Sequence, residues 1–561
     1  MTSDAVVVGS GPGGATAADV LTAAGWSVTI VEKGRNHLLD LGDPVGLRAE
    51  FSNDEIKFVH RHFLGPDPVV EPRTFRMSAH DGDRVHVGEV NSIPSTVGGG
   101  GVHADGKVPR LREEDFALLS TLGPVEGAAV DDWPVGYDEL EPYYADAERR
   151  VGVAGDATAN PLASWRSGPY PMPPGAPMYG AVRSAAAAER VGLHPYPAPT
   201  AANSVPYDGR PACNNCGFCA FFGCPIHAKG DPVAMLRRAL ASGRAELLAD
   251  TFACRLVTDG RRVTGVEVVT AEGRRRTIGA RAVVLAAGAI ETPRLLLLSG
   301  HHHPLVGRHL MTHFQTVAFG IFAEDLHAER GRAVTHVHDD AVVVDTDARR
   351  AAREAGLPWL RGGMVEHGGT GLPIAEAKRY RRGTRHAALM ASSPMRRHLW
   401  ALTMQGEDLP QPENAVDLDP TVRDARGFPV ARVTYRPHRH ELAASAHHRA
   451  RLVQVLEEMG ASTTGVFTSP TTPGELGWDG PRSAVPDSHH VMGTTRMGHD
   501  PGRSVVDGYG RVHGLDNVVV ADSSVFVTSS GYGPTLTLVA LAARAAGALA
   551  GSDPPRPAGT P

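Results

Sequence analysis

The pattern with the most direct chemical consequence is a glycine-rich turn at 9–14, Gly-Ser-Gly-Pro-Gly-Gly, which follows an apolar run and precedes an Ala-rich segment. Between a strand and a helix, Gly9 permits a tight bend, Gly11 lets a pyrophosphate approach the backbone, and Gly14 lets the helix pack on the strand. The helix N-terminus then stabilises the anion. Glu32, at the end of the next apolar run, is placed to accept a ribose hydroxyl. The pattern predicts a dinucleotide site without separating FAD from NAD.

Four of the five cysteines form a second cluster, Cys213-x2-Cys216-x2-Cys219-x4-Cys224. Thiolates at this spacing can share one Fe–S cluster or one tetrahedral Zn²⁺. They can also be structural cysteines, reduced or disulfide-linked, and we rank that interpretation first, an Fe–S cluster second and Zn²⁺ last. No metal site is therefore predicted unless this loop carries a cluster. The fifth cysteine, Cys254, falls in a predicted strand and is interpreted as a small core residue.

The elements around the glycine turn must position it, and the sequence predicts a β-α-β unit there. The apolar run 5–8 is a strand, the Ala-rich segment is a helix that Gly25 ends, and 27–31 is a second strand. Turn residues bound further strands at 253–268 and 276–286, and the latter leads into a helix from about Ile290. Such an opening is typical of a dinucleotide-binding domain.

A second group of segments predicts another sheet. Strands of this sheet are expected at 314–322, 341–345, 399–405, 414–418 and 430–435. A helical pattern then covers 438–459, strands return within 503–521, and an Ala-rich helix at about 534–550 precedes a Pro-rich tail. The region 155–211 is rich in Pro, Gly and Ala around one helix near 181–191, which indicates an inserted segment.

The composition limits the classes of protein that fit this chain. Its 561 residues exceed the ~250–300 at which a single core stops growing, so at least two domains or one large composite unit is expected. A net charge of −6 provides no basic excess for a nucleic acid or an anionic membrane, so neither is an expected partner. Five cysteines are too few for a secreted disulfide scaffold.

The location expected from the sequence is cytoplasmic. The first residues show no basic region followed by a cleavable apolar segment, since a strand-like run starts almost immediately. No later stretch offers the ~20 uninterrupted apolar residues that a membrane helix needs.

Four further stretches resemble the glucose-methanol-choline (GMC) oxidoreductases. They are 97–103 (VGGGGVH), 288–300 (GAIETPRLLLLSG), 490–498 (HVMGTTRMG), and 519–524 (VVADSS) together with 534–537 (PTLT). They occur in the order of that family and span nearly the whole chain. The resemblance implies FAD, rather than NAD, bound in a Rossmann-like domain, with a sheet-containing substrate domain that closes a pocket over the isoalloxazine ring.

The fold class that follows is α/β, with a Rossmann-like FAD-binding domain and a mixed-sheet α+β substrate-binding domain. The FAD-binding domain is expected in three parts, 1–154, 231–312 and 486–550. The rest divides into a Pro/Gly-rich insertion with the Cys loop (155–230), the substrate-binding domain (313–485) and a disordered tail (551–561).

His490 is the expected catalytic base. The active-site histidine of the family stands three residues before a Gly-Thr pair, and His490 has that spacing. Oxidation of an alcohol requires removal of the hydroxyl proton as hydride leaves carbon for flavin N5, and imidazole titrates in the range that suits a base. Its neighbour His489 is interpreted as part of the pocket wall that meets the substrate.

One position departs from the family pattern. Relatives usually have a second His or Asn just before the Pro-Thr-Leu-Thr segment, where this chain has Gly533. Glycine has no side chain to hold the substrate hydroxyl, so either Ser530 or Tyr532 substitutes as a catalytic residue, or His490 acts with less help. The departure could also signal altered chemistry, because some relatives of this fold run lyase reactions rather than net oxidation.

The remaining cofactor contacts are implied by the resemblance. Besides Gly9, Gly11, Gly14 and Glu32, the residues expected to contact FAD are Val97, Gly99, His103, Ala253, Asp522, Pro534 and Thr535. His103 matches the offset at which some members bond a histidine covalently to the flavin, whereas in many others a histidine near this position makes only a polar contact beside the ring.

The expected reaction is oxidation of a hydroxyl group of a sugar or sugar-like compound, with O₂ or another electron acceptor reoxidising FAD. Gln405 and Glu407, in a stretch that resembles the floor of the substrate domain, are candidates to face this small polar substrate, although a turn-stabilising or solvated role is equally expected. The primary 6′-hydroxyl of an aminoglycoside is one target within this class. Oxidation of a glycoside at its 3-hydroxyl, oxidation of a sterol or other alcohol, a lyase or non-redox flavin protein, and an electron-transfer subunit with an Fe–S cluster in the Cys loop are the alternatives.

Overall fold

The computed structural model describes most of the chain. The described residues are 2–36, 66–82, 86–88, 90–91, 93–217, 219, 223–368, 383–469, 488–552 and 554–555. Positions 553 and 556–561 of the expected C-terminal tail therefore lie outside the described residues, as do 218 and 220–222 of the Cys loop.

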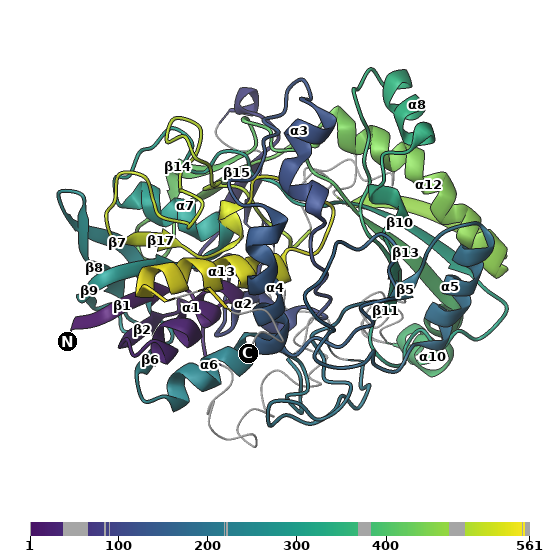
Figure 1. Cartoon of the computed structure of the whole chain (residues 1–561), viewed down its shortest axis with the longest axis horizontal. Helices are drawn as coiled ribbons and strands as arrows, with labels where there is room; N and C mark the ends of the chain where they lie inside the picture. The colour runs from purple at the N-terminus through teal and green to yellow at the C-terminus, as the bar shows by residue number, and fades with distance from the viewer. Residues whose placement is uncertain are drawn as a thin grey trace.

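A seven-stranded sheet carries the N-terminal β-α-β unit (Figure 1). Its parallel strands are β6 (Ala245–Leu248), β2 (Val28–Val31), β1 (Thr2–Val8), β9 (Arg275–Leu285) and β17 (Val518–Val520). The first half of β9 pairs instead with an antiparallel hairpin of β8 (Arg262–Val269) and β7 (Phe252–Asp259). The valine-rich runs of β1 and β2 are buried, as expected for parallel strands covered on both faces.

The topology brings three distant segments to one edge of this sheet. Strands β1, β9 and β17 lie side by side and parallel, so their carboxyl ends meet at the same edge. The turn after Val8, the turn after Leu285 and the residues after Val520 therefore lie together, although they are far apart in the sequence. In open α/β sheets this edge is where ligands bind.

Four helices pack around this sheet edge. Figure 1 shows α13 (Thr535–Ala550) lying beside α1 (Pro12–Ala23) and α4 (Tyr137–Val151), and α6 (Pro232–Ala241) packs on the other side of α1. The face of α1 toward the sheet is built from alanine and glycine, which permits close approach of helix and strand. The position of the glycine turn is thus fixed by α1 and its neighbours.

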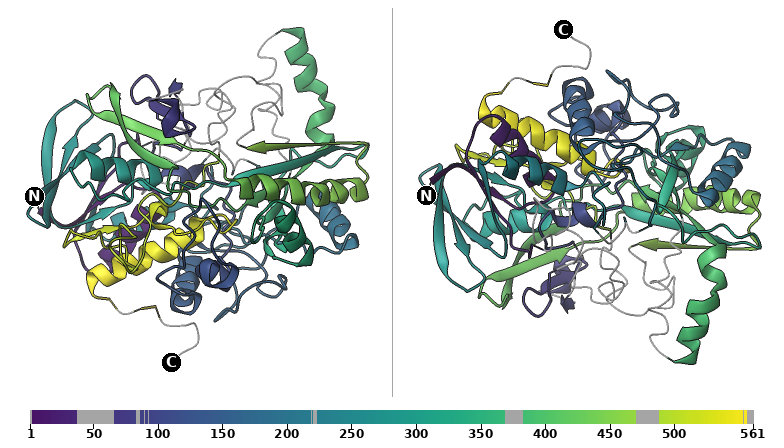
Figure 2. Two further views of the ribbon diagram at one scale, coloured as in Figure 1. Left: turned by 90° about the horizontal axis from the view of Figure 1, so that it is seen from above. Right: turned by 90° about the horizontal axis from the view of Figure 1, so that it is seen from below.

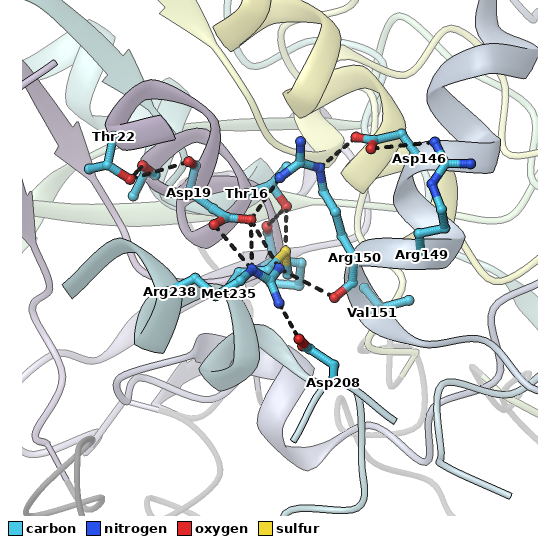
Figure 3. Close-up of polar contacts among 12 residues, drawn as sticks. Thr16, Asp19, Thr22, Asp146, Arg149, Arg150, Val151, Asp208, Met235 and Arg238 are labelled. Carbon is cyan, nitrogen blue, oxygen red and sulfur yellow. Dashed lines mark hydrogen bonds and ion pairs between the residues drawn. The ribbon is translucent and has the colours of Figure 1, made fainter. Parts of the chain in front are cut away.

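Asp19 ties three of these elements together (Figure 3). Its buried carboxylate on α1 accepts hydrogen bonds from Arg150 of α4 at 2.7 Å and from Arg238 of α6 at 2.9 Å. Arg238 also donates to Asp208 at 3.0 Å, which joins the inserted segment to the same cluster. A carboxylate shared by two guanidinium groups holds the helices at fixed separation.

A six-stranded antiparallel sheet forms the other half of the molecule. In order across the sheet its strands are β16 (Thr463–Ser469), β10 (Phe314–Ile321), β13 (Leu399–Gly406), β12 (Val365–Gly368), β11 (Val334–His338) and β5 (Tyr196–Pro197). Helices α12 (Arg439–Met459) and α5 (Tyr179–Arg190) cover one face. Along β10, buried residues alternate with half-buried ones, so the opposite face is less covered.

Two predictions about this second sheet are wrong. The segment 341–345 is not a strand but contains a 3₁₀ helix at Asp340–Val342, because a short buried apolar run does not by itself distinguish strand from turn. The strands expected at 414–418 and 430–435 exist as β14 (Ala415–Arg423) and β15 (Pro429–Thr434), but they form a separate four-stranded sheet with β3 (Arg73–Arg76) and β4 (His86–Gly88). Sequence periodicity does not specify which strands pair.

Shorter helices complete the fold. They are α2 (Gly99–His103), α3 (Leu118–Leu122), α7 (Gly288–Leu298), α8 (Thr346–Glu354), α10 (Thr384–Ser392) and α11 (Pro394–His398). Figure 2 shows α10, in green, extending away from the body of the molecule. None of the helices within the described ranges is long and apolar enough to span a bilayer.

Candidate active site

A cavity of about 1040 Å³ lies between the carboxyl edge of the seven-stranded sheet and the less covered face of the six-stranded sheet. Most of the residues expected from the sequence to bind cofactor or substrate line it. They are Gly9, Gly11, Glu32, Gly99, His103, Ala253, Gln405, His489, His490, Asp522, Pro534 and Thr535.

The glycine turn presents open backbone to this cavity. Gly9 has φ +101°, and a Cβ there would lie 2.3 Å from the Ala286 carbonyl oxygen, so the bend needs glycine. A Cβ on Gly14 would lie 2.0 Å from the Gly9 oxygen. At Gly11, in contrast, a Cβ would meet no atom of the described chain within 4 Å. Gly11 is also the N-cap of α1, where first-turn N–H groups have no partner within the helix, so this opening suits a phosphate.

Glu32 has hydrogen-bonding capacity left for a ligand. Its carboxylate accepts from the backbone N–H and the hydroxyl of Ser10, at 3.0 and 2.7 Å, and from the backbone N–H of Gly34 at 2.8 Å. A carboxylate offers about four lone-pair positions, so three contacts leave one for a ribose hydroxyl. Burial raises the pKa of this carboxyl, and the three hydrogen bonds act against that rise.

Asp522 orders the neighbouring part of the sheet edge. It accepts hydrogen bonds from the N–H of Gly288, at the start of α7, and from the hydroxyl of Thr292. Its other oxygen accepts from the N–H and hydroxyl of Ser524. The residue thereby joins the segments after β9 and β17, and it lines the cavity at their junction.

His490 and His313 form a hydrogen-bonded pair at the cavity. Their Nδ1 atoms lie 2.8 Å apart, with ring centroids at 4.8 Å and planes at 85°. The Nε2 of His313 lies 3.2 Å from the carbonyl oxygen of Ser529. A carbonyl can only accept, so His313 must donate from Nε2, and its neutral ring then accepts at Nδ1. His490 must therefore donate from Nδ1, which leaves its Nε2 as an unprotonated acceptor.

Burial keeps both rings neutral. It lowers the pKa of His313 to about 4, and it lowers the pKa of His490 well below the usual histidine value. The positive charges that His313 and Lys107 can carry act in the same direction on His490. At neutral pH the Nε2 of His490 is therefore an unprotonated acceptor, and His313 holds the ring in place. This is the form that a general base requires.

A polar network that sequence reasoning missed lies on the same wall. The Lys107 ammonium contacts Asp105 at 2.9 Å and Glu366 at 2.5 Å. Gln405 donates to Glu366, and Gln315 donates to Gln405, both at 3.0 Å. Burial alone would lower the pKa of Lys107, but Asp105 and Glu366 outweigh it and raise that pKa above its ordinary value. The lysine is therefore charged at neutral pH.

Several expected site residues are not among the described residues that line the cavity. Glu407 is fully buried elsewhere: it pairs with Arg361 at 3.0 Å and accepts from the N–H of Ser530 at 2.8 Å. Ser530 and Tyr532 are likewise buried away from the cavity wall. Gly14 and Val97 are also buried and are not among the described residues that line the cavity.

At Gly533 the cavity has room for a side chain. The residue lines the cavity, and the nearest atoms that a Cβ would meet are the Lys107 carbonyl oxygen at 3.7 Å and Pro109 Cδ at 3.9 Å. Only the backbone of this residue faces that space.

All four cysteines of the Cys loop are among the described residues. Cys213, Cys216, Cys219 and Cys224 are all unbridged, and burial raises the pKa of Cys219 to about 12. Within the described part of the chain, no three His, Cys, Asp or Glu side chains lie where they could share a metal ion. Cys254 is buried in β7, as predicted for a core residue.

Comparison with known proteins finds similarity to one enzyme family. Two family models for GMC oxidoreductases match residues 185–315 and 410–542. The chain is 32% identical to 6'''-hydroxyparomomycin C oxidase of Streptomyces lividus, over 98% of this chain and 91% of that protein. It is 29% identical to 2-methyl-1,2-propanediol dehydrogenase of Mycolicibacterium austroafricanum, over 97% and 94% of the two chains.

The fold is also similar to that of solved structures. Formate oxidase of Aspergillus oryzae, in a variant used to study FAD modification, superposes with a TM-score of 0.65 over 98% of each chain at 15% identity. At this identity the likeness concerns the fold alone.

Proposed function

The chain belongs to the GMC oxidoreductase family, and on this premise we propose that it oxidises a hydroxyl group of a sugar or sugar-like compound, with FAD as cofactor and His490 as base. The observation that carries the proposal is the chain of hydrogen bonds from the Ser529 carbonyl through His313 to His490. It leaves the His490 Nε2 as the acceptor nitrogen of a residue on the cavity wall.

The residues at the sheet edge fit FAD. The open backbone at Gly11 and the N-terminus of α1 would hold the pyrophosphate, and Glu32 would accept a ribose hydroxyl. Gly533, Pro534 and Thr535, at the N-terminus of α13, line the other side of the cavity and favour negative charge there. When bound, FAD supplies the acceptor for the hydride that leaves the carbinol carbon.

In this proposal two residues of the chain act on the substrate hydroxyl. His490 removes its proton at Nε2, and the low pKa set by burial keeps the ring neutral until that step. Lys107 makes the polar contact that Gly533 cannot make. Two of its three N–H donors go to Asp105 and Glu366, which leaves one for the substrate oxygen.

The identity of the substrate is the finer part of the proposal. The two relatives are named for an aminoglycoside and for a small diol, and both compounds carry hydroxyl groups that can be oxidised. We place the primary 6′-hydroxyl of an aminoglycoside, the 3-hydroxyl of a glycoside and the hydroxyl of a sterol in one candidate set. O₂ or another acceptor would reoxidise FAD.

A second candidate function is motivated by Gly533. A site without the usual second polar side chain would suit a lyase or a non-redox flavin protein, if Lys107 does not take over the contact. This alternative predicts that no alcohol reduces the bound flavin.

The test is anaerobic addition of a panel of alcohols and sugars to the purified holoenzyme while the flavin absorbance is recorded. Bleaching by at least one hydroxylated compound is expected. His490→Asn should slow bleaching by about 10²–10⁴-fold, the usual contribution of a general base. His302→Asn, at an exposed histidine, is the matched control. A panel that leaves the flavin oxidised would favour the second candidate.

His103 lies on the cavity wall and is buried. Covalent attachment through this residue is a separate part of the proposal. Acid precipitation tests it: a yellow pellet from the parent enzyme and a colourless pellet from His103→Ala would support the bond. Yellow colour left in the supernatant of the parent enzyme would mean that His103 makes only a polar contact with the flavin.

A further inference from the structure

The cavity face of the six-stranded sheet changes character along its strands. On β10, Gln315, Val317 and Phe319 line the cavity, whereas Thr316 and Ala318 point to the opposite face and are fully buried. This alternation follows from the pleat of a strand, in which every second side chain lies on the same face. The wall can therefore be followed row by row, away from the base.

The rows nearest His490 are polar. Gln315 is two residues beyond His313, which holds His490, and the strand register places Gln405 of β13 directly opposite Gln315. Glu366 of β12 accepts a hydrogen bond from Gln405 and contacts Lys107. This end of the wall offers amide, carboxylate and ammonium groups to hydroxyl groups of a ligand.

Farther from His490 the wall becomes apolar, first on the side of β16. Val317 pairs with Phe467 of β16, whereas its partner on β13 is Thr403, which lies opposite Glu366 of β12. In the next row Phe319 pairs with Ala401 of β13, with Leu399 beyond them. All of these residues line the cavity, and Val317, Phe319, Phe467 and Leu399 are only half-buried. The Phe319 and Phe467 rings lie 6.3 Å apart with planes at 47°. At ~3.3 Å per residue, Phe319 lies ~13 Å along the strand from Gln315.

This gradient has a consequence for the ligand. Covering an open apolar patch inside a cavity with another apolar group lowers the free energy, because both surfaces leave water. A polycationic aminoglycoside would bring charged groups against this patch and would lose hydration without compensation.

Resting on the proposed function, we propose that the substrate is amphiphilic: a sugar-like head, with its reacting hydroxyl at His490, that carries an alkyl or aryl group lying on Val317, Phe319 and Phe467. A head of one sugar ring spans the polar rows, and the apolar group then begins where the wall becomes apolar. Of the three candidate substrates, this selects glycosides of apolar aglycones over aminoglycosides.

A series with one head group and increasing apolar length tests the inference. Methyl, butyl and octyl β-D-glucopyranoside, below micelle-forming concentrations, are titrated into the FAD holoenzyme, and Kd is read from the perturbation of the flavin absorbance. Full burial would tighten Kd by about fourfold per methylene. Because the wall covers the chain from one side, octyl glucoside should bind at least about tenfold more tightly than butyl glucoside.

Variants locate the effect. Val317→Thr and Phe319→Thr should each reduce the Kd of methyl glucoside divided by the Kd of octyl glucoside, since each removes apolar contact from the wall. Val317→Thr changes the shape of the side chain little, so the test stands even if Phe319→Thr does not fold. Ile321→Thr is the matched control, because Ile321 lies on the same strand and is not among the described residues that line the cavity.

Equal Kd values across the series, no binding by any member, or tighter binding of paromamine than of octyl glucoside would each overturn the inference. The titration needs no turnover, so it is separate from the proposed function. Tight binding of octyl glucoside without anaerobic bleaching would support an amphiphilic site and count against oxidation of that head group.

Discussion

Replacement of His313 by aspartate should move the acid limb of the pH–rate profile upward. The Oδ1 of aspartate stands where the Nδ1 of His313 stands, and that atom is 2.8 Å from the His490 Nδ1. In the parent enzyme the neutral ring of His313 faces His490, and burial lowers the pKa of His490. The base therefore stays active well below the usual histidine pKa. A carboxylate in the same place stabilises the protonated, inactive form of His490, so activity is lost at a higher pH.

The size of the shift can be estimated from the geometry. Two unit charges about 4 Å apart interact by about 4 kcal/mol at an effective dielectric constant of ~20, which corresponds to about 3 pK units. Burial of the new carboxylate reduces this, so the acid limb should rise by about 1–3 pH units. His313→Asn offers a neutral oxygen in the same place and should leave the limb nearly unchanged. His313→Leu removes the acceptor and should slow flavin reduction by about 2–10-fold, the worth of one hydrogen bond.

The assay is anaerobic flavin reduction by the best alcohol of the panel, measured as kcat/KM against pH for the three variants. His302→Asp, which adds a carboxylate at an exposed position, controls for net charge. A purely structural role for His313 would lower the rate without moving the limb. If His313→Asp left the acid limb where it is in the parent enzyme and in His313→Asn, the proposed link between the two rings would be refuted.

Three further predictions concern the fold and the site. Gly11→Ala should fold normally but bind FAD more weakly, because its Cβ points into open space, whereas Gly13→Ala should fail to fold, because its Cβ would lie 1.7 Å from the Ala521 oxygen; flavin content and circular dichroism check both. Asp19→Asn should lower the free energy of unfolding by about 1.5–3 kcal/mol, because two arginines lose their shared carboxylate. Asp208→Asn, at the exposed end of the cluster, should lower it by less than about 1 kcal/mol. Urea titration measures both. Tyr532→Phe should leave the rate of flavin reduction unchanged, because Tyr532 is not among the described residues that line the cavity; a large loss of rate would return it to the catalytic site.

The sequence by itself determined the parts of this protein whose cause is local. A bend requires glycine at 9 and a close approach requires it at 14, while Gly11 leaves an open face, so the motif predicts a turn that the structure places at the cavity. The resemblance to the GMC family, through the spacing of His490 before Gly493, indicates a residue that does line the cavity. The strands at 5–8 and 276–286 and the last helix were predicted from apolar runs, which report burial directly.

Only the tertiary structure decided what surrounds His490. His313 and Lys107 lie 177 and 383 positions before it in the chain; His313 contacts it and Lys107 lines the same cavity because the fold brings these distant segments together. Glu407 follows Gln405 by two positions, so strand alternation alone would place both side chains on one face. Strand β13 ends at Gly406, however, and beyond it Glu407 pairs with Arg361 in the interior, whereas Gln405 lines the cavity. Periodicity predicts that a strand exists and that its faces differ. Which face meets the cavity depends on strand pairing, and the free energy of that pairing comes from contacts between segments that no local pattern encodes.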